Sequence, residues 1–245
     1  MNLEIEGKQA LVLGASTGLG NAVAKRLVDE GVKTIICSRS EKKLRDAISE
    51  TGAYGYELCD LTDSSQREQV IEMIKSKYGA IDILVTNSGG PPQGEFLAIT
   101  NEQWHQEFEN LWMGSIAFIR AFLPGMIAKN WGRVVMITSV SAKESILNLT
   151  LSNAYRAGLL GLCNSISQEV AQANVTINSV LPGYIATQRL IDLGRDPSIL
   201  KEKIPAKRIG QPSEFADLVC FLASQRASYI TGQAIACDGG ILKGI

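Results

Sequence analysis

Three glycines near the N-terminus have the spacing of a phosphate-binding turn. Gly14, Gly18 and Gly20 follow an apolar run at residues 9–13 and precede an amphipathic stretch at residues 19–30. Glycine lets the backbone approach a pyrophosphate, and the N–H groups of a helix N-terminus favour its negative charge. The pattern predicts dinucleotide binding, although such turns also arise for packing alone. The residues expected to contact the nucleotide here are Gly14, Ser16, Thr17, Gly18, Leu19 and Gly20.

The end of the second predicted strand, residues 33–38, indicates which nucleotide fits. A site for NAD usually has Asp or Glu at this point to accept hydrogen bonds from the ribose. Here Ser38 is followed by Arg39, and no acid is present. A guanidinium can bind a 2′-phosphate bidentately, and the absence of a carboxylate removes a repulsion. Arg39 therefore favours NADP over NAD, the alternative being an arginine that is simply solvated.

The elements that must position these residues alternate along the chain. Strand-like runs and helical patterns predict an α/β fold with a Rossmann-type doubly wound parallel sheet, in a single NAD(P)-binding domain over residues 1–245. Ligands of such sheets bind at the carboxyl ends of the strands. The predicted strands are residues 9–13, 33–38, 54–58, 83–86, 133–138, 175–180 and 234–237. The predicted helices are residues 19–30, 41–51, 64–78, 100–129, 152–173 and one that opens at Pro212.

Composition argues against several other classes of protein. The chain has 24 basic and 25 acidic residues and no basic tract, so no nucleic acid partner is expected. The first six residues carry acids where a signal peptide would be basic. The apolar segment 115–128 is interrupted by Arg120 and Pro124, so no membrane partner is expected either. We expect a soluble, cytoplasmic protein.

Neither the cysteines nor the histidine has the spacing of a metal site. The five cysteines are dispersed without a C-x-x-C pair, as expected for small buried hydrophobic residues. The single His105 follows Trp104 and has no Cys near it in sequence, so we expect a solvated helix residue. No metal is predicted.

Several short motifs follow one another in order along most of the chain. They are Asp60-Leu61, Asn87-Ser88-Gly89-Gly90, residues 132–135 before Ser139, residues 178–180, Pro182-Gly183, residues 208–212, residues 229–232 and residues 238–240. With these motifs the chain is similar to the short-chain dehydrogenase/reductase family, and in pattern to its 3-oxoacyl-acyl-carrier-protein reductases. The resemblance implies an adenine contact at Asp60-Leu61, a cofactor-facing turn containing Asn87 and Gly89, an active-site serine at Ser139, and a nicotinamide-facing turn at Pro182-Gly183 with Thr187. The family also pairs helices between subunits, which implies a homo-tetramer, with a dimer as the alternative.

The catalytic pair of that family is altered in this chain. Family members place a Tyr proton donor and, four residues later, a Lys that lowers its pKa. Gly158, Gly161 and the residues after them set the register, which puts Ser152 and Arg156 at these two positions. Tyr155 lies one residue before Arg156, so it is out of register.

Three interpretations follow. In the first, the enzyme transfers a hydride, Arg156 or Ser139 stabilises the developing alkoxide, and water or Tyr155 supplies the proton. In the second, Tyr155 itself reaches the site, because position i+3 lies near the same helix face as Ser152. In the third, the chain binds the nucleotide without redox chemistry, as a sensor or a structural subunit.

The substrate, a small carbonyl or alcohol compound, is expected between the loop at residues 89–94 and the segment 184–208. That segment is polar and poor in helix compared with its flanks, as a lid would be. Its basic residues fit an anionic substrate such as a carrier-linked acyl group, or simply a solvated surface. They are Arg189, Arg195, Lys201, Lys203, Lys207 and Arg208.

Overall fold

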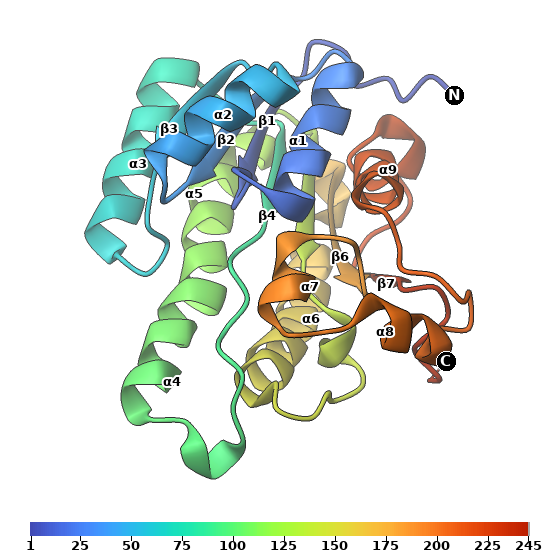
Figure 1. Cartoon of the computed structure of the whole chain (residues 1–245). Coiled ribbons are helices and arrows are strands. Elements are labelled where there is room, and N and C mark those ends of the chain that lie inside the picture. Colours follow the sequence, from blue (N-terminus) through green and yellow to red (C-terminus); the bar gives the residue numbers. More distant parts are fainter. Residues whose placement is uncertain (245) are drawn as a thin grey trace.

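Seven parallel strands form one sheet in the computed structural model, which describes residues 1–244 (Figure 1). The strand order is β3-β2-β1-β4-β5-β6-β7, so the chain reverses direction across the sheet between β1 and β4. Open α/β sheets bind ligands at that reversal. The predicted Rossmann-type sheet is therefore confirmed. The strands are β1 (Gln9–Leu13), β2 (Lys33–Ser38), β3 (Gly55–Leu58), β4 (Ile83–Thr86), β5 (Gly132–Ile137), β6 (Val175–Pro182) and β7 (Ala234–Cys237).

Helices cover both faces of the sheet, because successive strand side chains point to opposite faces. Ala10 and Val12 of β1 pack in a core with α1, α2 and α9, whereas Leu11 and Leu13 pack in a second core with α3, α5 and α6. The helices are α1 (Gly18–Asp29), α2 (Glu41–Thr51), α3 (Ser64–Tyr78), α4 (Asn101–Glu107), α5 (Gly114–Ala128), α6 (Thr150–Val170), α7 (Gln188–Asp192), α8 (Pro197–Lys203) and α9 (Pro212–Leu222).

Two segments differ from the sequence-based expectation. The long helix predicted over residues 100–129 is divided into α4, a π-helical turn at Phe108–Met113, and α5. It begins at a capping box formed by Thr100 and Gln103. The segment 184–208 is not helix-poor, because it forms α7 and α8. α8 begins where Asp196 caps the helix and Pro197 occupies its first turn.

The continuous helical stretch Asn101–Ala128 is, among residues 1–244, the one helix long and apolar enough to cross a membrane by length and composition. A core helix of a soluble protein passes the same test, and the α5 part of this stretch packs against α3, β4 and β5. Only 39% of its most apolar window is buried within the chain. Its exposed large apolar side chains include Phe108 and Ile127.

Four of the five cysteines and the histidine lie where the sequence predicted them. Cys37, Cys59, Cys163 and Cys220 are unpaired and buried, and Cys237 is unpaired and half-buried. His105 is exposed on α4. These residues act as packing and surface groups.

Candidate active site

The glycine turn between β1 and α1 is closely packed. Gly14 has φ +58° and accepts a hydrogen bond on its carbonyl from Nδ2 of Asn87 at 3.0 Å. A Cβ on Gly14 would lie 2.7 Å from that nitrogen, and a Cβ on Gly20 would collide with the carbonyl oxygen of Gly14. Side chains are thus excluded at both positions, which leaves the bare backbone facing the ends of β1 and β4.

The N-terminus of α1 is electrostatically open to an anion. Thr17 is its extended N-cap residue and makes no side-chain capping bond, and the first turn contains no acid. The unpaired N–H groups and the helix dipole therefore remain available to a negative charge. Ser16 is anchored to the end of β2 through its hydroxyl, 2.9 Å from that of Ser38. A Cβ on Gly18 would come within 3.8 Å of Thr187, so the turn at the end of β6 faces this helix. Together these features fit a pyrophosphate.

Two more of the predicted nucleotide residues flank this turn. Leu19 is half-buried against the core of α1, α2 and α9, so it fixes the helix rather than facing solvent. Arg39 is exposed directly after β2, and among residues 1–244 no hydrogen bond or ion pair holds its guanidinium. Its charge is free for an anionic ligand.

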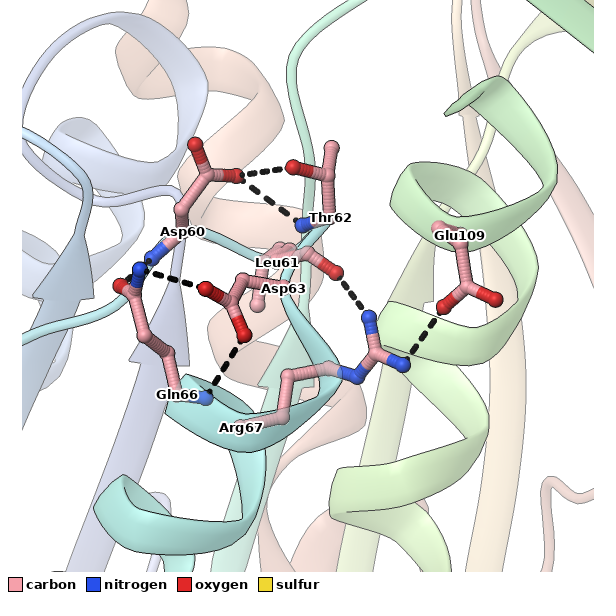
Figure 2. Close-up of polar contacts among 7 residues, drawn as sticks. All are labelled: Asp60, Leu61, Thr62, Asp63, Gln66, Arg67 and Glu109. Atoms are coloured by element: carbon pink, nitrogen blue, oxygen red, sulfur yellow. Dashed lines mark hydrogen bonds and ion pairs between the residues drawn. The ribbon is translucent and has the colours of Figure 1, made fainter. Parts of the chain in front are cut away.

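The loop after β3 is fixed by its own hydrogen bonds, as Figure 2 shows. The carboxylate of Asp60 accepts bonds from the backbone N and the hydroxyl of Thr62 at 3.0 and 2.8 Å. Arg67 donates to the carbonyl of Leu61 at 2.5 Å and pairs with Glu109 at 2.6 Å. Because α3 and the π-helical turn both hold this loop, Asp60 and Leu61 present a rigid edge beside the strand ends.

The turn after β6 is equally constrained. The backbone N of Gly183 donates to the carbonyl of Cys237 at 3.0 Å, and a Cβ on Gly183 would lie 2.7 Å from Asp238. Pro182 ends the strand, and the hydroxyl of Thr187 donates to the carbonyl of Ile185 at 3.5 Å. The predicted nicotinamide-facing residues therefore form one tight turn.

Three serine hydroxyls lie in series at the end of β5. Oγ of Ser139 accepts a bond from the backbone N of Ser141 at 3.1 Å, and Oγ of Ser141 lies 3.0 Å from Oγ of Ser152. Ser141 and Ser152 are buried, whereas Ser139 is partly exposed. Ser152 is thus paired with Ser141, and Ser139 is the hydroxyl of the series that has access to a ligand.

Arg156 connects α6 to the same strand end. Its Nη1 donates to the carbonyls of Thr138 at 2.8 Å and Ile137 at 3.2 Å. Burial lowers the pKa of Arg156 to about 10, which leaves the guanidinium charged at neutral pH. The guanidinium of Arg156 is therefore held at the carbonyl of Thr138, the residue directly before Ser139.

Tyr155 is directed away from this cluster. Its hydroxyl donates to the carbonyl of Trp104 at 2.8 Å, and its ring packs 5.5 Å from the ring of Trp104 and 6.2 Å from that of Phe108. Trp112 also donates to the Tyr155 carbonyl at 3.1 Å. These contacts hold the Tyr155 side chain of α6 against α4 and the π-helical turn. They count against the interpretation in which Tyr155 reaches the site.

Sequence reasoning missed a buried acid beside the site. Glu107 accepts a bond on Oε2 from Nδ2 of Asn110 at 2.9 Å, and the same nitrogen lies 3.4 Å from the carbonyl of Gly89. Burial raises the pKa of Glu107, although the charges of nearby arginines oppose this. A signal existed, because Glu107 lies three residues after Trp104 and four before Leu111, which is the apolar side of the helix.

Arg189 was predicted only as one of several lid charges, but it contacts the loop after β4. Its Nη2 donates to the carbonyl of Pro91 at 2.6 Å, and a Cβ on Gly90 would lie 2.6 Å from its Nε. Gln93 also donates to the carbonyl of Leu193 at 3.5 Å. The two segments expected to border the substrate are therefore in contact through Arg189 and Gln93.

The chain is similar to known proteins over nearly its whole length. A family model described as enoyl-(acyl carrier protein) reductase matches residues 14–242. A 3-oxoacyl-[acyl-carrier-protein] reductase of Salmonella typhimurium is 35% identical over 241 residues, which cover 98% of this chain and 99% of the relative.

Solved structures give the same result. L-sorbose reductase from Gluconobacter frateurii, complexed with NADPH and L-sorbose, matches with a TM-score of 0.92 and 29% identity over the full length of both chains. YwfH, an NADPH-dependent reductase involved in bacilysin biosynthesis, matches with a TM-score of 0.92 and 30% identity over 98% of this chain and all of the other. Both solved relatives are reductases with the same arrangement of strands and helices.

Proposed function

The chain belongs to the short-chain dehydrogenase/reductase family, and we propose that it is an NADPH-dependent oxidoreductase acting on a carbonyl or alcohol substrate with altered proton-donor machinery. The observation that carries this proposal is the glycine turn at the N-terminus of α1, where Gly14 and Gly20 leave bare backbone for a pyrophosphate. NADPH supplies a hydride when bound. The NADPH in the L-sorbose reductase complex supports the same cofactor here.

The chain offers contacts for each part of that nucleotide. Arg39, free of internal partners within residues 1–244, is the proposed clamp for the 2′-phosphate, with Ser38 beside it. The proposed adenine contacts are Asp60 and Leu61, and the proposed nicotinamide-facing residues are Asn87, Gly89, Pro182, Gly183 and Thr187. NAD would lack the phosphate that Arg39 binds, so NADP is favoured.

Arg156 and Ser139 are the proposed electrostatic partners of the substrate oxygen. Reduction of a carbonyl creates negative charge on oxygen, and a fixed cation or hydroxyl donor stabilises it. Arg156 retains its charge at neutral pH and is held at the end of β5 by two carbonyls. It cannot release a proton to the oxygen, because the pKa of a guanidinium is too high. The proton must therefore come from another group.

Turnover of a carbonyl panel tests the function. NADPH oxidation is followed with 3-oxoacyl thioesters, keto acids, ketoses and aldehydes, and binding of NADPH and NADH is measured by calorimetry. We expect NADPH to bind and at least one carbonyl class to be reduced. Absence of any nucleotide binding would contradict the proposal outright.

A non-catalytic nucleotide-binding role is the second candidate. The observation that favours it is that Ser152 occupies the tyrosine position with its hydroxyl paired to Ser141, while the Tyr155 hydroxyl is paired to Trp104. Such a chain would act as a sensor or a structural subunit. Tight NADPH binding with no turnover of the panel would select this role.

We also propose that the chain is cytoplasmic and assembles as a homo-tetramer, with a dimer as the alternative. The support is the apolar surface of Asn101–Ala128, of whose most apolar window only 39% is buried within one chain. Exposed apolar side chains of this stretch, such as Phe108 and Ile127, can be covered by a second subunit. Light scattering of the purified chain gives the mass that decides between monomer, dimer and tetramer.

A further inference from the structure

We infer that Glu107 is the proton donor of the reaction, taking the role of the tyrosine that Ser152 replaces. This inference rests on the proposed function, since it names the group that completes that reaction. It stands on the position of the carboxyl, on its free oxygen, on the charges around it, and on the chemistry of the other candidates.

Glu107 is linked to the loop after β4 through Asn110. It is the last residue of α4, directly before the π-helical turn Phe108–Met113, and it is buried. Nδ2 of Asn110 donates to Oε2 of Glu107 at 2.9 Å and to the carbonyl of Gly89 at 3.4 Å. A Cβ built on Gly89 would meet nothing within 4 Å, so the loop after β4 borders open space there. The carboxyl is therefore tied to the loop proposed to face the nicotinamide.

One oxygen of this carboxyl is available for proton transfer. Asn110 engages Oε2, and no hydrogen bond from residues 1–244 engages Oε1. In the described residues, the side-chain atoms that are buried without any partner are Oγ1 of Thr176 and Oγ of Ser179. Oε1 of Glu107 is not one of them. Oε1 is thus not fully sealed from solvent, and the bond from Asn110 to Oε2 holds the side chain in place.

The charged groups around Glu107 come from three other elements. Arg156 on α6, Arg189 on α7 and Arg39 after β2 each lower its pKa, and its charge in turn raises the pKa of Tyr155. Burial outweighs the three guanidinium groups, so the net effect is a pKa above the usual glutamate value. A buried carboxyl of this kind keeps its proton to a higher pH, which is how enzymes obtain a carboxylic acid that works near neutrality.

The other hydroxyls and cations are poorer donors. Arg156 stays charged at neutral pH, and an isolated serine hydroxyl does not release a proton there. Burial raises the pKa of Tyr155, whose hydroxyl hydrogen is directed at the carbonyl of Trp104. Glu107 is the group in this cluster with both a free oxygen and an accessible protonated state.

The substrate gains one proton and one hydride in the reaction. The proton on Oε1 of Glu107 passes to the carbonyl oxygen of the substrate, while the carbonyl carbon accepts the hydride and the reduced nicotinamide is oxidised. The product is an alcohol, and Glu107 is left as a carboxylate that Arg156 and Arg189 stabilise until solvent returns a proton. In the direction of alcohol oxidation the same carboxylate is the base.

Glu107→Gln tests the assignment with the best carbonyl of the panel as substrate. The amide keeps the shape and the bond to Asn110 but has no acidic proton, so we expect kcat to fall about 10²–10⁴-fold. In the wild type, kcat/KM should decline as pH rises through the pKa of Glu107, and this decline should vanish in the variant. Glu107→Asp should recover part of the rate, and Glu102→Gln, the same change on the exposed side of α4, should change nothing.

A second readout does not depend on turnover. In protein labelled with [δ-¹³C]glutamate, the resonance absent from Glu107→Gln identifies the carboxyl, and we expect it to titrate above the other glutamates. Titration together with the exposed glutamates would overturn the inference. So would a Glu107→Gln variant with the wild-type rate and pH profile, and that result would leave the proposed function intact. Nucleotide binding without reduction of any carbonyl would overturn both.

Discussion

The site lies along the carboxyl ends of the strands, and its two halves are built in different ways. At the ends of β1 to β4 the backbone forms most of the site, through the glycine turn, the N-terminus of α1 and the braced loop of Asp60 and Leu61, and Arg39 is the side chain proposed to add a charge. At the end of β5 and on α6 side chains form it, through Ser139, Ser152 and Arg156. A backbone site accepts few substitutions without collision, whereas a side-chain site can change its chemistry while the fold persists.

Of the changes in these two halves, removing the cation of the side-chain half should have the largest effect on turnover. We expect Arg156→Ala to lower kcat by about 10²–10³-fold, the usual cost of losing one donor to a developing oxyanion. NADPH affinity should stay near that of the wild type, because the bonds of Arg156 within residues 1–244 are to Ile137 and Thr138. Steady-state kinetics and calorimetry measure the two quantities.

Arg156→Lys is the matched control for this change. It keeps the charge and loses the forked donor, so its kcat should lie between those of the wild type and Arg156→Ala. Thermal unfolding of both variants separates an effect on the reaction from the cost of two unpaired strand carbonyls, about 1–3 kcal/mol each. A variant that loses affinity for NADPH as much as turnover would show that the two halves are not independent.

A change in the backbone half should instead act on binding. The Cβ of Gly20→Ala collides with the carbonyl of Gly14, and overpacking of this kind costs about 1–3 kcal/mol. If that cost falls on the bound state, the Kd for NADPH rises roughly 5- to 150-fold. Fluorescence titration of NADPH gives the Kd.

Gly125→Ala on α5 is the control, since a Cβ at Gly125 would meet nothing within 4 Å. It should leave the Kd unchanged and stabilise the helix slightly. Equal losses of NADPH affinity in both variants would indicate that helical glycines in general, rather than the glycine turn between β1 and α1, govern binding.

Selectivity between the two nucleotides should depend on one exposed residue. We expect Arg39→Ala to raise the Kd for NADPH roughly tenfold, the size of one charge-assisted hydrogen bond. The Kd for NADH should not change, because that nucleotide has no 2′-phosphate. Calorimetry with both nucleotides at two salt concentrations checks this, since the NADPH preference should weaken as salt rises.

The same contrast explains what the sequence could predict. The glycine spacing and the alternation of strands and helices predicted the sheet, α1 and the glycine turn, because backbone constraints leave a local pattern in the sequence. The neighbours of Glu107 and Arg189 could not be predicted in this way. Asn110 reaches Gly89 and Arg189 reaches Pro91 across the fold, over separations that no local pattern encodes. The direction of the Tyr155 side chain depended on Trp104 and Phe108, which lie about 50 residues earlier in the chain.

Tyr155→Phe should have the smallest effect on turnover, and it is the sharpest test of the comparison. The change removes the bond to the carbonyl of Trp104, so the free energy of unfolding should fall by about 0.5–1.5 kcal/mol while kcat and the NADPH affinity stay at wild-type values. Urea unfolding and steady-state kinetics measure both. Phe keeps the ring contacts with Trp104 and Phe108, so any loss of activity would have to come from the hydroxyl. Loss of turnover with unchanged stability would mean that Tyr155 leaves the aromatic cluster to serve the reaction, and the proton would then come from this tyrosine rather than from Glu107.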